Sequence, residues 1–293
     1  MKLFSPDSAH WYQRDGVACH TVPSLKGEPR PTTLRDARKL GLLPSVTNIL
    51  GVIAKPELTA WLQEQAVMAA LTLPRIAGET EDAFAKRVVA DSQTTRDGAA
   101  DFGTGFHHGA ERVAQTLEVD PKHPAAEWLR HYRVWYQGNA LALRWTEKVL
   151  IHPEGCYAGT ADLLIEHPVH GLTLVDLKTM KMKSGGPCGR PPVMTPYKTW
   201  CYQLAAYRYA LLSSPGFDTT SGQPVKCMNL VVNSVEPSVP IEHVWSDAEM
   251  ESGWQAFMAA HRLWVIEKSY DPAQAKAETL KTEIGKSGMV LTA

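Results

Sequence analysis

The spacing of apolar residues changes once along this chain, near residue 140, and this change limits the possible folds more than any other feature. Before it, apolar residues recur at helical spacing in four segments: residues 55–73, 81–90, 102–117 and 125–136. After it, apolar and polar residues alternate in three segments joined by two five-residue loops: residues 143–151, 157–166 and 172–178. The remaining elements expected are a helix at residues 199–212, two strands at 228–235 and 241–244, and a final helix at 247–269. This order predicts an α/β fold in which an antiparallel meander belongs to a sheet flanked by helices.

Three regions are expected along the chain. Residues 1–98 form an N-terminal arm and a helical extension packed on the core, residues 99–270 form the core itself, and residues 271–293 form a C-terminal tail with few apolar residues. Within the arm, residues 1–43 contain many turn-forming residues and show no sustained period, so a hairpin or an extended segment is expected there. Ser45 then offers an N-cap to a short apolar run.

Composition excludes several classes of protein. The 30 Lys and Arg residues nearly balance the 31 Asp and Glu residues, so a polyanion would have to bind a local patch. The chain begins without the segments of a signal peptide and holds no run of about 20 apolar residues, so we expect no membrane association. The five cysteines are scattered and never form CxxC, which argues against zinc and against an iron–sulfur cluster.

The strongest candidate site lies on the second and third strands of the meander. A register that pairs the residues next to their loop places Asp162 opposite Asp176. Two carboxylates that face each other within apolar strands repel, and a divalent cation such as Mg²⁺ or Mn²⁺ is the natural compensation. Lys178 lies on the same face as Asp176, within reach of a metal-bound water. Leu177 points away, which leaves its backbone carbonyl as a further ligand.

These residues resemble the metal-binding core of the PD-(D/E)XK nucleases, in particular the RecB-like exonuclease branch. The strings GTAD at 159–162 and VDLKT at 175–179 resemble its two strand motifs, GTGFH at 103–107 its upstream GTxxH helix, and QLAAY at 203–207 its downstream QxxxY helix. The string PSVT at 44–47 is similar to phage-type and mitochondrial genome maintenance exonucleases. The resemblance implies a restriction-endonuclease-like core with a mixed, largely antiparallel sheet, flanking helices and an N-terminal helical extension.

The two helix motifs supply further candidate residues. The resemblance implies that His107 is a metal ligand, and the neighbouring His108 leaves open which of the two it is. Glu111 follows His107 by one helical turn and is a ligand, an orienting residue or a surface charge. Gln203 and Tyr207 are also one turn apart, and we expect their shared face to hydrogen-bond a phosphate or a nucleotide or else to pack within the fold.

Glu147, on the first strand of the meander, is a further candidate because relatives often place another acid there. Our expected pairing across the first loop sets Thr146 opposite Asp162 and leaves Glu147 one position off. Glu147 would therefore need a bulge to reach the site.

A positively charged strip follows the third strand. Residues 177–217 contain six basic residues and no Asp or Glu, and aromatic residues are interleaved with them. Such a strip is suited to a nucleic-acid backbone with unpaired bases stacked on the rings, and the alternative is a solvated basic face over an aromatic core. The candidate DNA-binding residues are Lys181, Lys183, Arg190, Tyr197, Lys198, Trp200 and Arg208.

The residues and the resemblance together predict a Mg²⁺- or Mn²⁺-dependent deoxyribonuclease. The expected activity is that of an exonuclease that leaves 5′-phosphate ends during recombination, repair or phage DNA processing, with Lys178 positioning or deprotonating the attacking water. DNA, as single strands or duplex ends, is the expected partner, together with a recombination or single-strand-binding protein. The expected location is the cytoplasm of a bacterial or phage-infected cell. Two alternatives stay open: a structure-specific or restriction-like endonuclease, and an inactive nucleic-acid-binding protein on the same fold.

Overall fold

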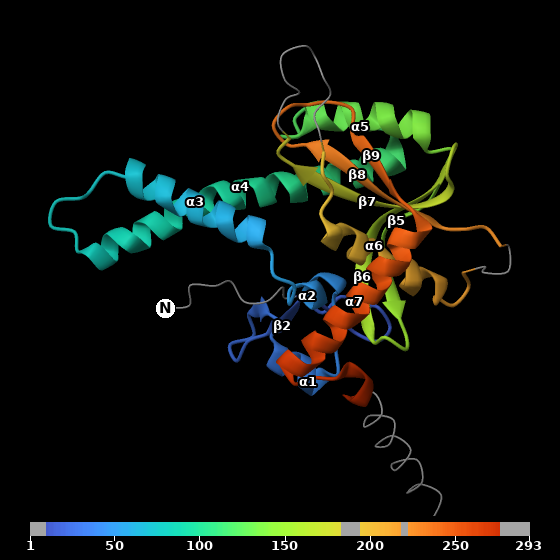
Figure 1. The fold of residues 1–293 in the computed structure, drawn as a ribbon, viewed down its shortest axis with the longest axis horizontal. Helices are drawn as coiled ribbons and strands as arrows, with labels where there is room; N and C mark the ends of the chain where they lie inside the picture. Colours follow the sequence, from blue (N-terminus) through green and yellow to red (C-terminus); the bar gives the residue numbers. More distant parts are fainter. Residues whose placement is uncertain (1–9, 183–193, 218–221, 276–293) are drawn as a thin grey trace, which may run out of the picture.

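A five-stranded mixed sheet forms the centre of the protein (Figure 1). The computed structural model describes residues 10–182, 194–217 and 222–275. The strands lie in the order β5-β6-β7-β8-β9, and every neighbouring pair is antiparallel except β7 and β8, which are parallel. Their bounds are Ala142–His152 for β5, Tyr157–His167 for β6, Gly171–Met180 for β7, Lys226–Asn233 for β8 and Ile241–Trp245 for β9. The predicted α/β class and the mixed, largely antiparallel sheet are therefore confirmed.

Helices cover both faces of this sheet, as Figure 1 shows. On one face, α4 (Glu81–Thr116) and α5 (Ala126–Asn139) bury aromatic and aliphatic side chains against β6, β7 and β8. On the other face lie α2 (Val46–Leu50), α6 (Lys198–Leu212) and α7 (Asp247–Lys268). The two apolar layers follow from the alternation of side chains along each strand.

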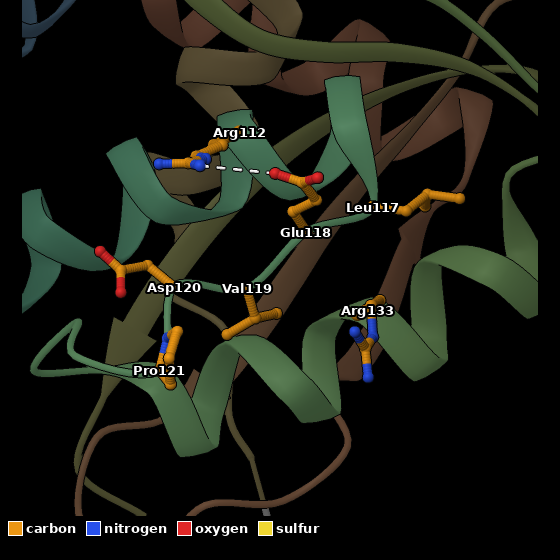
Figure 2. Close-up of a pocket in the computed structure, with 7 residues that line it drawn as sticks. All are labelled: Arg112, Leu117, Glu118, Val119, Asp120, Pro121 and Arg133. Carbon is orange, nitrogen blue, oxygen red and sulfur yellow. Dashed lines mark hydrogen bonds and ion pairs between the residues drawn. The ribbon is translucent and has the colours of Figure 1, made fainter.

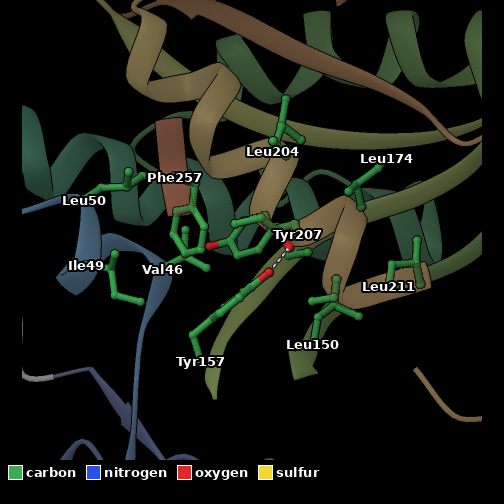
Figure 3. Packing of buried hydrophobic residues seen from close by; sticks show 14 of the residues in the cluster. Val46, Ile49, Leu50, Leu150, Tyr157, Leu174, Leu204, Tyr207, Leu211 and Phe257 are labelled. Atoms are coloured by element: carbon green, nitrogen blue, oxygen red, sulfur yellow. Dashed lines mark hydrogen bonds between the residues drawn. The ribbon is translucent and has the colours of Figure 1, made fainter. Parts of the chain in front are cut away.

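Figure 3 shows the core on the α6 side. Leu204, Tyr207 and Leu211 project from one face of α6 onto the sheet and onto α2. The hydroxyl of Tyr157 donates a hydrogen bond to the Ala206 carbonyl at 2.9 Å, which ties β6 to α6. This packing fixes the height of α6 above the strands, and that height decides which α6 side chains reach β7.

The N-terminal arm contains the expected hairpin, formed by β2 (Thr21–Pro23) and β3 (Pro29–Pro31). A second short pair joins β1 (Trp11–Tyr12) to β4 (Leu43–Pro44). Ser45 caps α2 as expected, because its hydroxyl accepts a hydrogen bond from the Asn48 N–H.

The expectation of only a hairpin or an extended segment before residue 44 was wrong, because α1 (Leu34–Leu40) forms there. Thr33 and Asp36 cap its first turn reciprocally, and Gly41 ends it with φ of 65°. The helix is too short to show a hydrophobic period, but the capping box and the terminal glycine are visible in the sequence.

Where the sequence predicts two helices, at 81–90 and 102–117, the structure has the single helix α4. With α3 (Pro56–Thr72) it forms a helical hairpin that extends away from the sheet (Figure 1). Gly98, in the intervening segment, lowers helix propensity but does not interrupt the helix. One continuous element therefore crosses the expected boundary between residues 98 and 99.

Residues on both sides of the expected C-terminal boundary contact the N-terminal arm. The Tyr270 hydroxyl donates to the Leu42 carbonyl at 2.8 Å, and the Arg14 guanidinium donates to the Pro272 carbonyl at 2.6 Å. Residues 276–293 of the expected tail lie outside the described residues. Among the helices that the structure describes, none combines the length and the apolar character needed to cross a bilayer.

The register between β6 and β7 is the predicted one, since Leu163 pairs with Val175 and Glu166 pairs with Leu172. The register between β5 and β6 differs by one residue from our prediction, because His152 itself pairs with Tyr157. The imidazole Nδ1 of His152 accepts the N–H of Gly155 at 2.8 Å, which shortens the turn.

This shift moves Glu147 to the position opposite Asp162, because Thr146 pairs with Leu163 and Lys148 pairs with Ala161. The predicted pairing of Thr146 with Asp162 was therefore wrong. A bulge does occur, between Leu143 and Trp145, but Glu147 does not depend on it to face the site.

Candidate metal centre

The candidate site lies where β6 and β7 stop pairing. Leu163 and Val175 form the last pair of their ladder. Beyond it, the carboxylate of Asp162 replaces a backbone acceptor, since its Oδ2 accepts a hydrogen bond from the Leu177 N–H at 2.6 Å. The side chains of Asp162 and Asp176 are 12% and 3% exposed. Two nearly buried acids therefore sit where the two strands separate.

His107 and Glu147 join Asp162 in a group of possible ligands. Nδ1 of His107 lies 3.7 Å from Oδ1 of Asp162, and ligand atoms of all three residues lie within 4.8 Å of one another. Ligands on opposite sides of a Mg²⁺ or Ca²⁺ ion are separated by about twice the metal–oxygen distance, or roughly 4–5 Å, so one cation fits among them. His108 is exposed, and the structure therefore favours His107 in the choice that the sequence left open.

Asp176 lies beside this group and is bound to Lys178. Nζ of Lys178 lies 2.6 Å from Oδ2 of Asp176 and donates to Oε1 of Gln203 at 3.1 Å. Nε2 of Gln203 donates in turn to the Tyr207 hydroxyl at 3.2 Å. The predicted common face of Gln203 and Tyr207 is confirmed, and both ends of the Gln203 amide are used to hold Lys178 and Tyr207.

Gly159 explains how Tyr207 reaches this chain of contacts. A Cβ atom at Gly159 would lie 2.6 Å from Cε1 of Tyr207, closer than any two carbon atoms pack. The tyrosine is 4% exposed and rests on the backbone of β6. Any side chain at residue 159 would therefore displace Tyr207.

Burial and mutual repulsion perturb the acids of the site. Burial, and after it the charge of Asp162, raises the pKa of Glu147 to about 7. Burial raises the pKa of Asp176 to about 6 against the opposing charge of Lys178. Burial also raises the pKa of Asp162, but the nearby His107 imidazole, the charge of Lys178 and the hydrogen bond from the Leu177 N–H together outweigh it, and the net pKa is lowered. A divalent cation would relieve this crowding of negative charge, and a donor set rich in carboxylate oxygen suits Mg²⁺ or Mn²⁺.

Two further predicted residues stand at the edge of this arrangement. Glu111 accepts a hydrogen bond from Nε2 of Gln115 at 3.1 Å and is not in the group of possible ligands, although its charge contributes to the raised pKa of Glu147. The Leu177 side chain packs on the α4 side of the sheet, opposite the face that carries Lys178 and α6. Its carbonyl stays a predicted ligand.

Part of the predicted basic strip lies at the same end of α6 as Gln203. Tyr197 and Trp200 form an edge-to-face pair with ring centroids 5.1 Å apart, and Tyr197 is 44% exposed. Lys181, just after β7, and Lys198, at the start of α6, are both exposed. Lys181 follows β7, which carries Lys178, and the other three lie at the start of α6, which carries Gln203.

Arg208 is engaged elsewhere in the fold. Nη1 of Arg208 lies 3.5 Å from Oδ1 of Asp247, whose other oxygen is 2.7 Å from Nζ of Lys226. Arg208 therefore has an internal partner that joins α6 to α7. Lys183 and Arg190 lie outside the described residues.

A second group of possible ligands, His167, His170 and Glu242, lies at the β6–β7 turn. Nδ1 of His167 accepts the backbone N–H groups of Val169 at 3.2 Å and His170 at 3.3 Å. In a neutral imidazole the proton is then on Nε2, which faces Oε1 of Glu242 at 3.6 Å. A protonated nitrogen cannot ligate a metal, so this group fits a buried histidine–glutamate contact better than a cation site.

Figure 2 shows a surface hollow of about 430 Å³ at the end of α4. Arg112 lies 3.5 Å from Glu118 across it, and the other lining residues are Leu117, Val119, Asp120, Pro121 and Arg133. Its mixture of two arginines and two acids selects neither an anion nor a cation. None of the candidate ligands lines this hollow.

Comparison with known proteins gives no family assignment. No family model matches the chain, and no curated protein matches it. Among solved structures, the crystal structure of SSO0001 is 11% identical and aligns over 70% of this chain and 86% of its own, with a TM-score of 0.26. Similarity at this level carries no functional information.

Proposed function

We propose that this protein is a Mg²⁺- or Mn²⁺-dependent DNA exonuclease with a restriction-endonuclease-like core of the PD-(D/E)XK type. The observation that carries the proposal is the convergence of Asp162, Asp176 and Lys178 at the point where β6 and β7 separate. His107 and Glu147 lie close enough to Asp162 to complete a ligand set. The ion pair between Lys178 and Asp176 would not by itself need two further acids, Asp162 and Glu147, beside it.

Asp162, Asp176, His107 and Glu147 would hold the cation. When bound, such an ion makes a water nucleophilic at neutral pH and stabilises charge on the phosphate. Lys178 has three N–H donors, of which Asp176 and Gln203 occupy two. The third is left to orient the attacking water or a phosphate oxygen, with hydrolysis leaving a 5′-phosphate end.

Four residues just after β7 and at the start of α6 support a nucleic-acid substrate. Lys181 and Lys198 supply positive charge, and the exposed ring of Tyr197, braced by Trp200, offers a surface on which an unpaired base could stack. The preference for an exonuclease on DNA ends, in recombination, repair or phage DNA processing, comes from the sequence resemblance. The same resemblance underlies a recombination or single-strand-binding protein as partner. The proposed cytoplasmic setting comes from the scattered cysteines, read as reduced thiols.

The test is digestion of end-labelled single- and double-stranded oligonucleotides and of circular single strands, with Mg²⁺, Mn²⁺ or EDTA. We expect metal-dependent shortening from ends, intact circles, and 5′-phosphate products. Asp176→Ala should abolish cleavage and keep DNA binding, whereas His170→Ala, in the other histidine–acid group, should cleave normally.

Each alternative has its own outcome in this experiment. Cleavage of circles would replace the exonuclease with an endonuclease. DNA binding without cleavage by the unmodified protein in either metal would identify an inactive binding protein. Cleavage retained by Asp176→Ala would refute the assigned site.

A further inference from the structure

Asn229, in the middle of β8, was not anticipated from the sequence. The parallel register of β7 and β8 sets Asn229 beside Asp176, and the asparagine is fully buried. Its Nδ2 donates to Oδ2 of Asp176 at 2.7 Å, and its Oδ1 accepts the indole N–H of Trp245 at 2.7 Å. Both ends of the amide are therefore used, one of them on a candidate metal ligand.

Trp245 decides which end of the amide faces Asp176. An indole nitrogen donates a hydrogen bond and cannot accept one. The Asn229 oxygen must therefore face Trp245, and the NH₂ group must face the carboxylate. An asparagine without this neighbour could turn by 180° and present its oxygen to Asp176, which would repel the carboxylate.

The Asn229 amide also gives the two carboxylate oxygens of Asp176 different roles. Asn229 and Lys178 both contact Oδ2 of Asp176. Among the described residues, no side chain donates a hydrogen bond to Oδ1, so that oxygen is left to a cation. A carboxylate held in this way binds through one oxygen in one direction and loses little freedom when the cation arrives.

We propose that Asn229 is a positioning residue of the metal centre and that Trp245 orients it. This inference rests on the proposed function, because it assigns a role toward the cation that Asp176 would hold. Asn229 itself touches neither the cation nor the substrate. Loss of its contact should weaken metal binding by roughly 10–100-fold, the range found when residues behind metal ligands are removed.

The test compares Asn229→Leu and Trp245→Phe with Trp264→Phe. The last is a matched control, because Nε1 of Trp264 also donates to a buried asparagine oxygen, that of Asn48 at 3.1 Å, in the apolar core. Mn²⁺ binding to the full chain is titrated by calorimetry, and cleavage is measured against Mn²⁺ concentration. Far-ultraviolet circular dichroism and urea unfolding verify that each variant is folded.

Asn229→Leu and Trp245→Phe should require at least about tenfold more Mn²⁺ than the unmodified protein, and saturating Mn²⁺ should restore most of the cleavage rate. Trp264→Phe should lose stability and keep its Mn²⁺ titration. A purely structural role would instead leave the titrations of all three folded variants alike, and that result would overturn the inference. Trp245→Phe removes the indole N–H and part of the ring but keeps Asn229, and Trp264→Phe makes the same change elsewhere, so this pair decides the matter if Asn229→Leu fails to fold.

Asp176→Ala separates failure of this inference from failure of the proposed function. If it abolishes Mn²⁺ binding and cleavage while the Asn229 and Trp245 variants titrate normally, only the positioning role is wrong. If Asp176→Ala also titrates like the unmodified protein, the metal centre itself is wrong.

Discussion

Asp176→Asn should make the metal-free protein more stable at neutral pH while it abolishes cleavage. In the folded chain, burial raises the pKa of this carboxyl from 3.8 to about 6. A carboxyl whose pKa is raised in the folded state contributes stability that is fully present below its ordinary pKa. That contribution is lost as the pH rises through the pKa of the folded state. Above about pH 6 the ionised group therefore opposes folding, and asparagine, which cannot ionise, does not.

The size of the effect follows from the shift. The difference of about 2 pKa units corresponds to about 3 kcal/mol at 1.36 kcal/mol per unit. Asp176→Asn should therefore gain up to about 3 kcal/mol over the unmodified protein at pH 7.5, and the gain should shrink toward zero near pH 4. Mn²⁺ at about 100 times its dissociation constant would stabilise the unmodified protein by about 2.7 kcal/mol and the variant far less.

Urea unfolding in EDTA between pH 4 and pH 8 measures this difference. Asp36→Asn is a control of opposite sign, because hydrogen bonds from Arg30 and Thr33 lower the pKa of Asp36. The stability that Asp36 contributes is present above its ordinary pKa and is lost as the pH falls. Asp36→Asn should therefore be less stable to urea than the unmodified protein at pH 7.5. A difference between Asp176→Asn and the unmodified protein that does not change with pH would refute the reasoning.

Four further outcomes are expected. Lys178→Ala should cleave at least about 100-fold more slowly and still bind Mn²⁺, as oligonucleotide digestion and calorimetry would show. Gly159→Ala should destabilise the fold by about 1–3 kcal/mol in urea, since a Cβ there would lie 2.6 Å from the Tyr207 ring. Mn²⁺ affinity should rise with pH through about 7 as Glu147 loses its proton, and Glu147→Gln should flatten that rise in calorimetric titrations. Thr33→Ala should cost about 1 kcal/mol by removing the cap of α1, with cleavage unchanged.

The sequence allowed more of the sheet to be predicted than of the helices. Strand positions follow from an alternation that few other structures produce, and the β6–β7 register follows from the residues next to a short turn. The β5–β6 register was missed because a side chain, His152, takes part in its turn. A one-residue error of this kind reverses the face of every side chain, and it concealed that Glu147 faces Asp162.

Helix limits depended on contacts between distant parts of the chain. The apolar period divides α4 into two helices around a polar segment, residues 91–101. In the structure α4 is one continuous helix, with α3 packed along its first part and the sheet packed along its last part. The short helix α1 was not predicted because it shows no hydrophobic period, although its capping box can be recognised in the sequence. Local chemistry marks such ends more reliably than period does.

Some relations between the residues of the candidate site follow from the sequence, and others depend on the tertiary structure. The sequence by itself determined that Asp162, Asp176 and Lys178 share a hairpin and that Gln203 and Tyr207 share a helix face, because the periods of strand and helix fix these relations locally. Only the tertiary structure decided that Gln203 holds Lys178, that Arg208 pairs with Asp247, and that Asn229 stands behind Asp176. Those contacts join residues 25 to 53 positions apart, and their geometry depends on how the strands twist and how the helices settle on the sheet.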